Sequence, residues 1–252
     1  MIKPLNKPVH ITLIILFSLL TIFFGYLFYK EYANGRKSVE VYNDLKSFVF
    51  IPTVTTEETD LEKDTLKNGS NINFTELKNV NPDCVAWICI ENTNINYPVV
   101  QGSDNNYYLK HLVNGKENRA GSIFLDYRTN ISKQHSIIYG HNMKNKTMFA
   151  DLTKFKKQSY YDEHKEGLLI TPEQTYVIQF FAGYVANVED SAWKINFVSD
   201  EEFDVWLNNI KDKSSISSNI TPTVTDRIIT LSTCSYEFKN ARYVLHGILV
   251  KK

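Results

Sequence analysis

Three residues in the carboxy-terminal half of the chain have the types and spacing that thiol chemistry requires. Cys234 closes an apolar run that begins at Ile228, and Arg242 opens the next apolar run eight residues later. If these runs are antiparallel strands joined by the loop of residues 235–241, Cys234 and Arg242 lie within side-chain reach across the hairpin. A fixed cation there favours a thiolate and can donate hydrogen bonds to an oxyanion.

A histidine supplies the acid–base group that acyl transfer by a thiol needs. The predicted strand at 136–139, Ser-Ile-Ile-Tyr, is followed by Gly140 and His141, which places an imidazole at the end of a strand. With an ordinary pKa near ~6.5, an imidazole in this position can take up and return a proton. His135 and His246 lie farther from the strand end, so we expect them to be structural or exposed.

The other two cysteines are predicted to be packing residues. Cys84 and Cys89 are five residues apart, so in one strand they point to opposite faces, which disfavours a disulfide between them. The sequence contains no CxxC or HxxxH spacing that would indicate a metal site. We therefore expect two small buried side chains, and neither a metal nor an organic cofactor.

The elements that must position these groups are predicted to be short strands. Eight runs rich in β-branched and aromatic residues are separated by turn residues. They cover residues 85–90, 96–100, 122–126, 136–139, 168–171, 176–186, 227–233 and 242–250. This pattern predicts a mainly β fold, a closed or nearly closed eight-stranded barrel. Helices are expected at 148–155 and at 200–211, the latter with a capping-box signature of Ser199 and Glu202.

The amino-terminal part predicts a membrane anchor. Residues 11–29 carry no charge, and 15 of these 19 residues are apolar. As a helix this segment is ~28 Å long, close to the ~30 Å hydrocarbon core of a bilayer. A cleavable signal peptide has a shorter apolar region and a better cleavage site than Ala33-Asn34-Gly35.

This segment sets the expected domain organisation. We expect a cytoplasmic tail at 1–10, a single transmembrane helix at 11–29, a helical and then polar spacer at 30–72, and the folded domain at 73–252. Basic residues lie on both sides of the span, so the positive-inside rule does not clearly predict its orientation.

Composition excludes two classes of protein. The 28 Lys and Arg residues balance the 28 Asp and Glu residues, so the chain lacks the basic footprint of a general nucleic-acid binder. A hydrophobic content of 43% excludes a disordered chain. We therefore expect a folded protein with no nucleic-acid partner.

Together these segments resemble the sortases, the membrane-anchored cysteine transpeptidases of Gram-positive bacteria. The resemblance is carried by TLSTC at 230–234, by Arg242, and by YGH at 139–141, in the chain order His, Cys, Arg. It extends through residues 85–101, 104–111 and 121–128. The helix expected at 200–211 and the helical material before the barrel are most similar to class B. Some class B members have an acidic residue shortly after the cysteine, whereas here Glu237 is the third residue after it.

The resemblance implies a sortase-type β-barrel and a transpeptidation mechanism. Cys234 would attack the Thr carbonyl of a carboxy-terminal sorting motif (NPxTN- or LPxTG-like) in a secreted protein precursor and form a thioester. His141 would protonate the leaving amine and later deprotonate the incoming one, and Arg242 would stabilise the oxyanion or position the substrate. An amino group of a peptidoglycan precursor would then resolve the thioester.

The resemblance also implies a binding groove and a location. Asn105, Leu109 and Ser232 would line the peptide groove, although Leu109 would suit the core equally well. Because the substrates are outside the cell, the enzyme would be a single-pass protein of the cell membrane with its amino terminus in the cytoplasm and its catalytic domain outside.

Three other functions were weighed against this one. A papain-like protease has its cysteine before its histidine, and here the order is reversed. An L,D-transpeptidase also uses Cys and His on peptidoglycan, but its Gly-Cys-Arg type of motif is absent, since Thr233 and Ser235 flank Cys234. A catalytically silent membrane-tethered binding module is opposed only by the presence of all three reactive residues.

Overall fold

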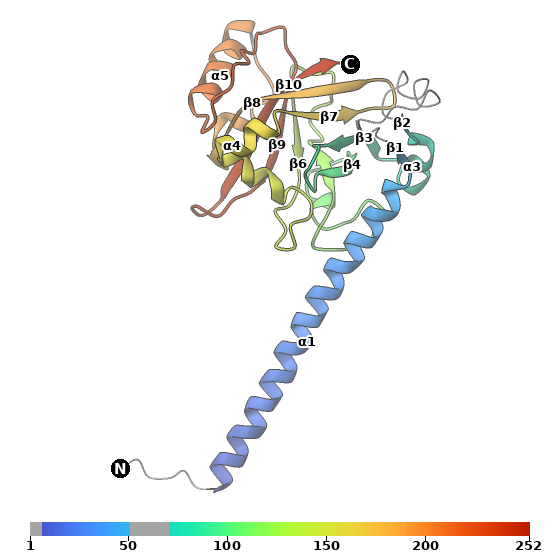
Figure 1. The fold of residues 1–252 in the computed structure, drawn as a ribbon, viewed down its shortest axis with the longest axis vertical. Coiled ribbons are helices and arrows are strands. Elements are labelled where there is room, and N and C mark those ends of the chain that lie inside the picture. The colour runs from blue at the N-terminus through green and yellow to red at the C-terminus, as the bar shows by residue number, and fades with distance from the viewer. Residues whose placement is uncertain (1–6, 51–70) are drawn as a thin grey trace.

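A computed structural model describes residues 7–50 and 71–252, in which one long helix leads into a β-barrel (Figure 1). Residues 1–6 and 51–70, which include part of the predicted tail and most of the predicted polar spacer, lie outside the described residues.

The eight predicted strands form a closed barrel in the order β10-β8-β7-β3-β4-β5-β6-β9. Their bounds are β3 (Cys84–Cys89), β4 (Asn96–Val100), β5 (Ile123–Leu125), β6 (His135–Tyr139), β7 (Glu166–Ile170), β8 (Thr175–Asn187), β9 (Ile228–Cys234) and β10 (Ala241–Lys251). Strands β4 and β5 pair in parallel, as do β6 and β9, and the other neighbours are antiparallel. The predicted eight-stranded barrel is confirmed.

Side-chain alternation along the strands creates two apolar layers. In β10, Tyr243 and Leu245 belong to the main core, whereas Val244 and Ile248 belong to a second cluster on the opposite face of the strand. That second cluster includes residues of α5 (Asp200–Asp212). The outer face of the carboxy-terminal strands is therefore covered by a helix.

The helix α5 follows from its sequence pattern. The Ser199 side chain accepts a hydrogen bond from Glu202 N over 3.3 Å and so caps the first turn, as predicted. Its apolar residues form one buried stripe, made of Phe203, Trp206, Leu207 and Ile210.

The remaining elements are short. They are β1 (Val49–Phe50), β2 (Asn71–Ile72), α3 (Phe74–Val80), η1 (Tyr107–Leu109), η2 (Ala150–Lys156), α4 (Gln158–Glu163) and η3 (Ser191–Trp193). The helix expected at 148–155 is a 3-10 helix, η2, that starts at Ala150, because Met148 has a left-handed backbone (φ 58°) that no helix contains.

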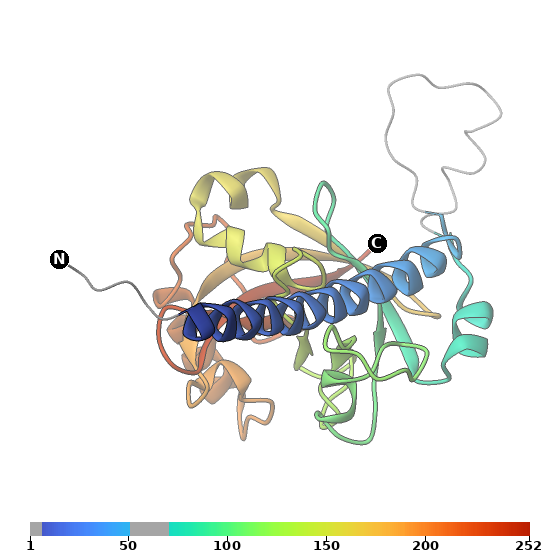
Figure 2. The ribbon, with the colours of Figure 1, turned by 90° about the horizontal axis from the view of Figure 1, so that it is seen from below.

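The first helix, α1 (Lys7–Lys46), is continuous through the predicted anchor and the predicted amphipathic segment. Its most apolar 18-residue window has a mean hydropathy of 2.5 and is long enough to cross a membrane. None of that window is buried against the rest of the chain that the structure describes. Figure 1 shows the amino-terminal half of α1 projecting away from the barrel, and Figure 2, seen from below, shows α1 in front of it.

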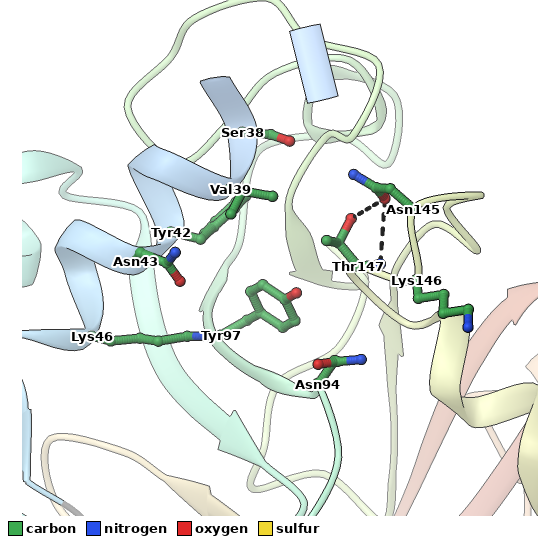
Figure 3. A pocket seen from close by; sticks show the side chains of 10 residues that line it. All are labelled: Ser38, Val39, Tyr42, Asn43, Lys46, Asn94, Tyr97, Asn145, Lys146 and Thr147. Carbon is green, nitrogen blue, oxygen red and sulfur yellow. Dashed lines mark hydrogen bonds between the residues drawn. The ribbon is translucent and has the colours of Figure 1, made fainter. Parts of the chain in front are cut away.

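The last turns of α1 pack against the barrel. Tyr42 and Leu45 are buried there, and the Tyr42 hydroxyl donates to the Gly121 carbonyl over 2.7 Å. A polar cavity of about 150 Å³ remains between α1 and the loop that carries Asn145 and Thr147 (Figure 3). Residues 30–46 are thus part of the folded unit.

Candidate active site

Strand pairing places Arg242 directly opposite Cys234. In the antiparallel pair of β9 and β10, Cys234 faces Arg242, and the next pair on the same side is Ser232 with Val244. The two strands are joined by residues 235–240, a loop one residue shorter than predicted because Ala241 already belongs to β10. The predicted cross-hairpin neighbours are confirmed.

The parallel pairing of β6 with β9 brings His141 to the same end of the barrel. Tyr139 pairs with Ser232, so both strands end at one rim. The His141 imidazole lies close enough to Cys234 for each to shift the pKa of the other, and its Nε2 lies 2.8 Å from the Leu109 carbonyl oxygen. Because a carbonyl only accepts, Nε2 carries the proton, which leaves Nδ1 to face the sulfur.

Gly140 allows β6 to end in this position. A Cβ there would lie 2.4 Å from Ile123 Cδ1 and 2.7 Å from Phe149 Cγ, both in the packed core. Only glycine therefore fits between the strand and His141, which explains this residue of the YGH segment.

Hydrogen bonds tie the two strand ends together. Thr233 Oγ1 donates to the Gly140 carbonyl over 2.8 Å, and Asn142 Nδ2 donates to the Cys234 carbonyl over 3.0 Å. The residues on either side of His141 are thus bonded to β9, and the imidazole is held beside the thiol by the backbone of both strands.

The electrostatics of the site favour a charged pair. The hydrogen bond with His141 lowers the pKa of Cys234 below that of an ordinary thiol, against the opposing effect of burial, and the charge of Arg242 lowers it further. The same hydrogen bond raises the pKa of His141, although burial opposes it, and the bond to the Leu109 carbonyl adds to the rise. Both shifts favour thiolate and imidazolium.

Exposure separates this thiol from the other two. Cys234, His141 and Arg242 are each half-buried, so a substrate can reach them. Cys84 and Cys89 are free and buried, and burial raises the pKa of their thiols to about 12 and about 11. The prediction that these two are packing residues is confirmed.

The three predicted groove residues have different surroundings. Leu109 packs partly against the core and offers its carbonyl to His141. Ser232 is buried, two positions before Cys234 on the same face of β9. Asn105 is half-buried, and its Oδ1 accepts a hydrogen bond from Tyr127 N over 3.1 Å. This hydrogen bond therefore joins it to the segment after β5 and not to Cys234, His141 or Arg242.

A charged cluster after the cysteine was not predicted. Lys156 of η2 donates to Ser235 Oγ over 2.8 Å and forms an ion pair with Glu237, which also accepts from Ser235. Although partial burial raises it, the bonds from Lys156 and Ser235 bring the pKa of Glu237 down to about 2. Nothing in the local sequence marks Lys156 as the partner, because it lies 79 residues before Ser235.

His135 and His246 are structural, as expected. Thr230 Oγ1 lies 2.7 Å from His135 Nε2 and 2.7 Å from His246 Nδ1, and all three residues are buried. Burial lowers the pKa of both imidazoles, that of His135 to about 4, so both are neutral near pH 7.

This barrel, with a cysteine and an arginine paired across one hairpin and a histidine beside them, belongs to a known class. Residues 88–250 match the family model described as the Sortase domain. The chain therefore belongs to the sortase family of cysteine transpeptidases.

Its relatives in that family are sortase B enzymes. Sortase B of Listeria monocytogenes is 34% identical over 92% of both chains. The structure of a Staphylococcus aureus sortase B–substrate complex is 36% identical, covers 71% of this chain and 84% of its own, and has a TM-score of 0.68. A sortase B complexed with triglycine has 36% identity and a TM-score of 0.67, and covers 71% of this chain and 85% of its own.

Proposed function

We propose that this chain is a membrane-anchored, class B-like sortase that joins secreted proteins to the cell wall. The observation that carries this proposal is the strand pairing that places Arg242 directly opposite Cys234 and brings His141 to the same end of the barrel. That arrangement supplies a nucleophile, a proton donor and an oxyanion-binding cation within one rim.

The first half-reaction is acylation of the cysteine. The Cys234 thiolate attacks the Thr carbonyl of an NPxTN- or LPxTG-like sorting motif, and the Arg242 guanidinium donates to the resulting oxyanion. One of its nitrogens, Nη1, is held 3.0 Å from the Ala241 carbonyl, which orients the side chain and leaves its other donors free. The imidazolium of His141 then protonates the leaving amine, and the C–N bond breaks to give a thioester.

The second half-reaction transfers the acyl group to an amine. Neutral His141 removes a proton from the incoming amino group, which we propose belongs to a peptidoglycan precursor. The amine attacks the thioester, the C–S bond breaks, and the thiolate–imidazolium pair is restored. The triglycine bound to a related sortase B supports an amine as the acceptor.

The peptide is proposed to lie along the rim between η1 and β9. Asn105, Leu109 and Ser232 are the side chains that we assign to this groove. The substrate complex of the S. aureus relative supports a peptide-binding site in this family. In this arrangement η1 contacts the substrate through Leu109 and holds His141 through the Leu109 carbonyl.

The location proposed for the enzyme follows from α1. Residues 11–29 anchor it in the cell membrane as a single span, with the amino terminus in the cytoplasm and the catalytic domain outside. The complete exposure of this apolar stretch supports the anchor, because a core helix of a soluble protein would be covered.

A peptide-library assay tests the activity. A fragment of residues 31–252 should join fluorescent peptides bearing sorting motifs to a glycine peptide, or release a hydroxamate when hydroxylamine replaces the amine. Cys234→Ala should abolish both the product and the covalent adduct seen by mass spectrometry, whereas Cys84→Ala and Cys89→Ala should retain them. A silent binding module would yield peptide binding without product, and a retained adduct in Cys234→Ala would refute the nucleophile.

A further inference from the structure

The contacts that dock α1 on the barrel begin directly after its apolar stretch. Glu31 forms an ion pair with Arg119, and the Asn34 carbonyl accepts from Asn118 Nδ2 over 3.0 Å. In a helix these positions rise ~3 Å and ~7.5 Å beyond Tyr29, where the apolar run ends. The headgroup layer on each side of a bilayer is roughly 5–8 Å thick. The loop of residues 114–119 therefore lies at headgroup level when residues 11–29 span the membrane.

A second loop approaches the same level and belongs to the active site. A Cβ at Gly35 would lie 3.4 Å from Asn145 Nδ2, so the loop that follows His141 touches α1 only ~9 Å beyond the apolar run. Figure 3 shows Asn145 and Lys146 on this loop, across the cavity from α1. The catalytic end of the barrel is thus held close to the membrane.

Exposed side chains of these two loops are mainly basic. Lys116 and Arg119 on the first loop and Lys144 and Lys146 on the second are all exposed, and Glu117 is the one acidic residue between 114 and 119 or between 143 and 147. Basic side chains at this level attract anionic headgroups.

The β9–β10 hairpin adds exposed aromatic residues at the same end. Tyr236 is 76% exposed and Phe238 is 47% exposed, and Lys239 follows them. Figure 1 shows this hairpin on the side of the barrel from which α1 descends, with the carboxy terminus on the opposite side. Aromatic rings next to basic residues are typical of surfaces that sit in the headgroup region.

We infer that these residues form a lipid-contact rim that docks on anionic phospholipid headgroups of the membrane carrying the anchor. The rim consists of Lys116, Lys144, Lys146, Tyr236 and Phe238. It holds the end of the barrel that carries His141 and Cys234 close to the membrane surface, where a membrane-bound substrate arrives. This inference rests on the proposed membrane anchor.

Lysine footprinting of the full chain in lipid nanodiscs tests the rim. The probe is the rate at which an amine-reactive acetylating reagent labels each lysine, read by mass spectrometry. Nanodiscs of phosphatidylcholine alone are compared with nanodiscs that also contain phosphatidylglycerol. Labelling of Lys116, Lys144 and Lys146 should be roughly threefold or more slower with phosphatidylglycerol, and high salt should remove the difference. Lys251 and Lys252, at the opposite end of the barrel, are the control within the same molecule.

Variants distinguish docking from nonspecific attraction. Lys144→Gln combined with Lys146→Gln should weaken the protection of Lys116, whereas Lys251→Gln combined with Lys252→Gln should leave it unchanged. Equal labelling of the rim lysines in both lipids would contradict the proposed contact with anionic lipid and would leave the proposed membrane anchor unaffected. Failure of the chain to enter nanodiscs of either lipid overturns the anchor and, with it, the rim.

Discussion

At the scale of single residues, Cys234 and His141 shift each other's proton affinity in opposite directions. The thiol becomes more acidic and the imidazole more basic through one shared hydrogen bond, so the two groups titrate as a coupled pair. Both shifts move the pair toward a thiolate and an imidazolium. In that form a reactive thiolate and a proton donor are present together.

Alkylation of the thiol measures this coupling. In the wild-type fragment 31–252, Cys234 should react with iodoacetamide at a pH below that expected for an ordinary thiol, whose pKa is ~8.5. His141→Ala removes the main cause of the lowered pKa, so the midpoint of the rate profile should move upward. Cys84 and Cys89 should remain unreactive throughout, because they are buried. An unchanged midpoint in His141→Ala would show that the hydrogen bond does not activate the thiol.

Arg242 should matter for the transition state more than for binding. Arg242→Ala should lower kcat/KM by about 10²–10³, the usual effect of removing one oxyanion donor, with most of the loss in kcat. Arg242→Lys keeps the positive charge but loses the planar set of guanidinium donors, so it should recover only part of the wild-type kcat/KM. Steady-state kinetics on one peptide measure both. A loss confined to KM would assign Arg242 to substrate positioning instead.

The proximity of Cys234, Arg242 and His141 was predictable from the sequence, but their surroundings were not. Cys234 and Arg242 are eight residues apart, so one assumed hairpin was enough to bring them together. The Leu109 carbonyl and Lys156 reach the site from other loops, 32 and 79 residues from their partners. Such contacts depend on the closed barrel and leave no local pattern.

At the scale of elements, the β9–β10 hairpin is fixed at its base by η2. Lys156 bonds both Ser235 and Glu237, the first and third residues after the cysteine. Because Ser235 adjoins Cys234, this clamp limits the movement of the proposed nucleophile. The acidic residue after the cysteine therefore contacts a lysine of η2 and shapes the loop.

Loosening this clamp should reduce turnover without unfolding the barrel. Glu237→Gln removes the ion pair, so we expect kcat to fall several-fold and the loop to exchange amide hydrogens faster. Glu173→Gln, at an exposed position in the β7–β8 turn, is the matched control. Transpeptidation kinetics and hydrogen-exchange mass spectrometry of 235–240 provide the measurements. Unchanged kinetics with faster exchange would show that loop mobility does not limit the reaction.

Strand positions were predictable because each strand is a short apolar or alternating run bounded by turn residues. The order of the strands was not, because β8 pairs with β10 and β3 pairs with β7 across long stretches of chain. The 3-10 form of η2 was also missed, since its start depends on the left-handed backbone of Met148.

At the scale of the whole molecule, the buried imidazoles link stability to pH. His135 has a folded pKa of about 4, below its unfolded value near ~6.5, so the unfolded chain binds more protons between these values. The contribution of neutral His135 to the free energy of unfolding is therefore complete above pH ~6.5 and is lost as the pH falls from there toward 4. This group alone should lower the free energy of unfolding by about 3 kcal/mol between pH 7 and pH 4.

Denaturant unfolding of fragment 31–252 across this pH range checks the link. His135→Gln should flatten the slope between pH 7 and pH 4, although its stability at pH 7 will be lower because a buried hydrogen bond is altered. An equal slope in His135→Gln and wild type would assign the acid sensitivity to other groups.

The docked end of α1 should contribute to the stability of the entire catalytic domain. Tyr42 and Leu45 are buried against the barrel, and burying one large side chain contributes ~1.5–3 kcal/mol, so a fragment of residues 71–252 should be less stable than 31–252 by roughly 3–6 kcal/mol. For a domain of this size that corresponds to a Tm lower by about 6–24 °C, which calorimetry would measure. A fragment of residues 37–252 is the matched control. It lacks the exposed ion pair of Glu31 with Arg119 but keeps both buried side chains, so its Tm should stay close to that of 31–252. Equal Tm values for all three fragments would mean that α1 only tethers the barrel and does not stabilise it.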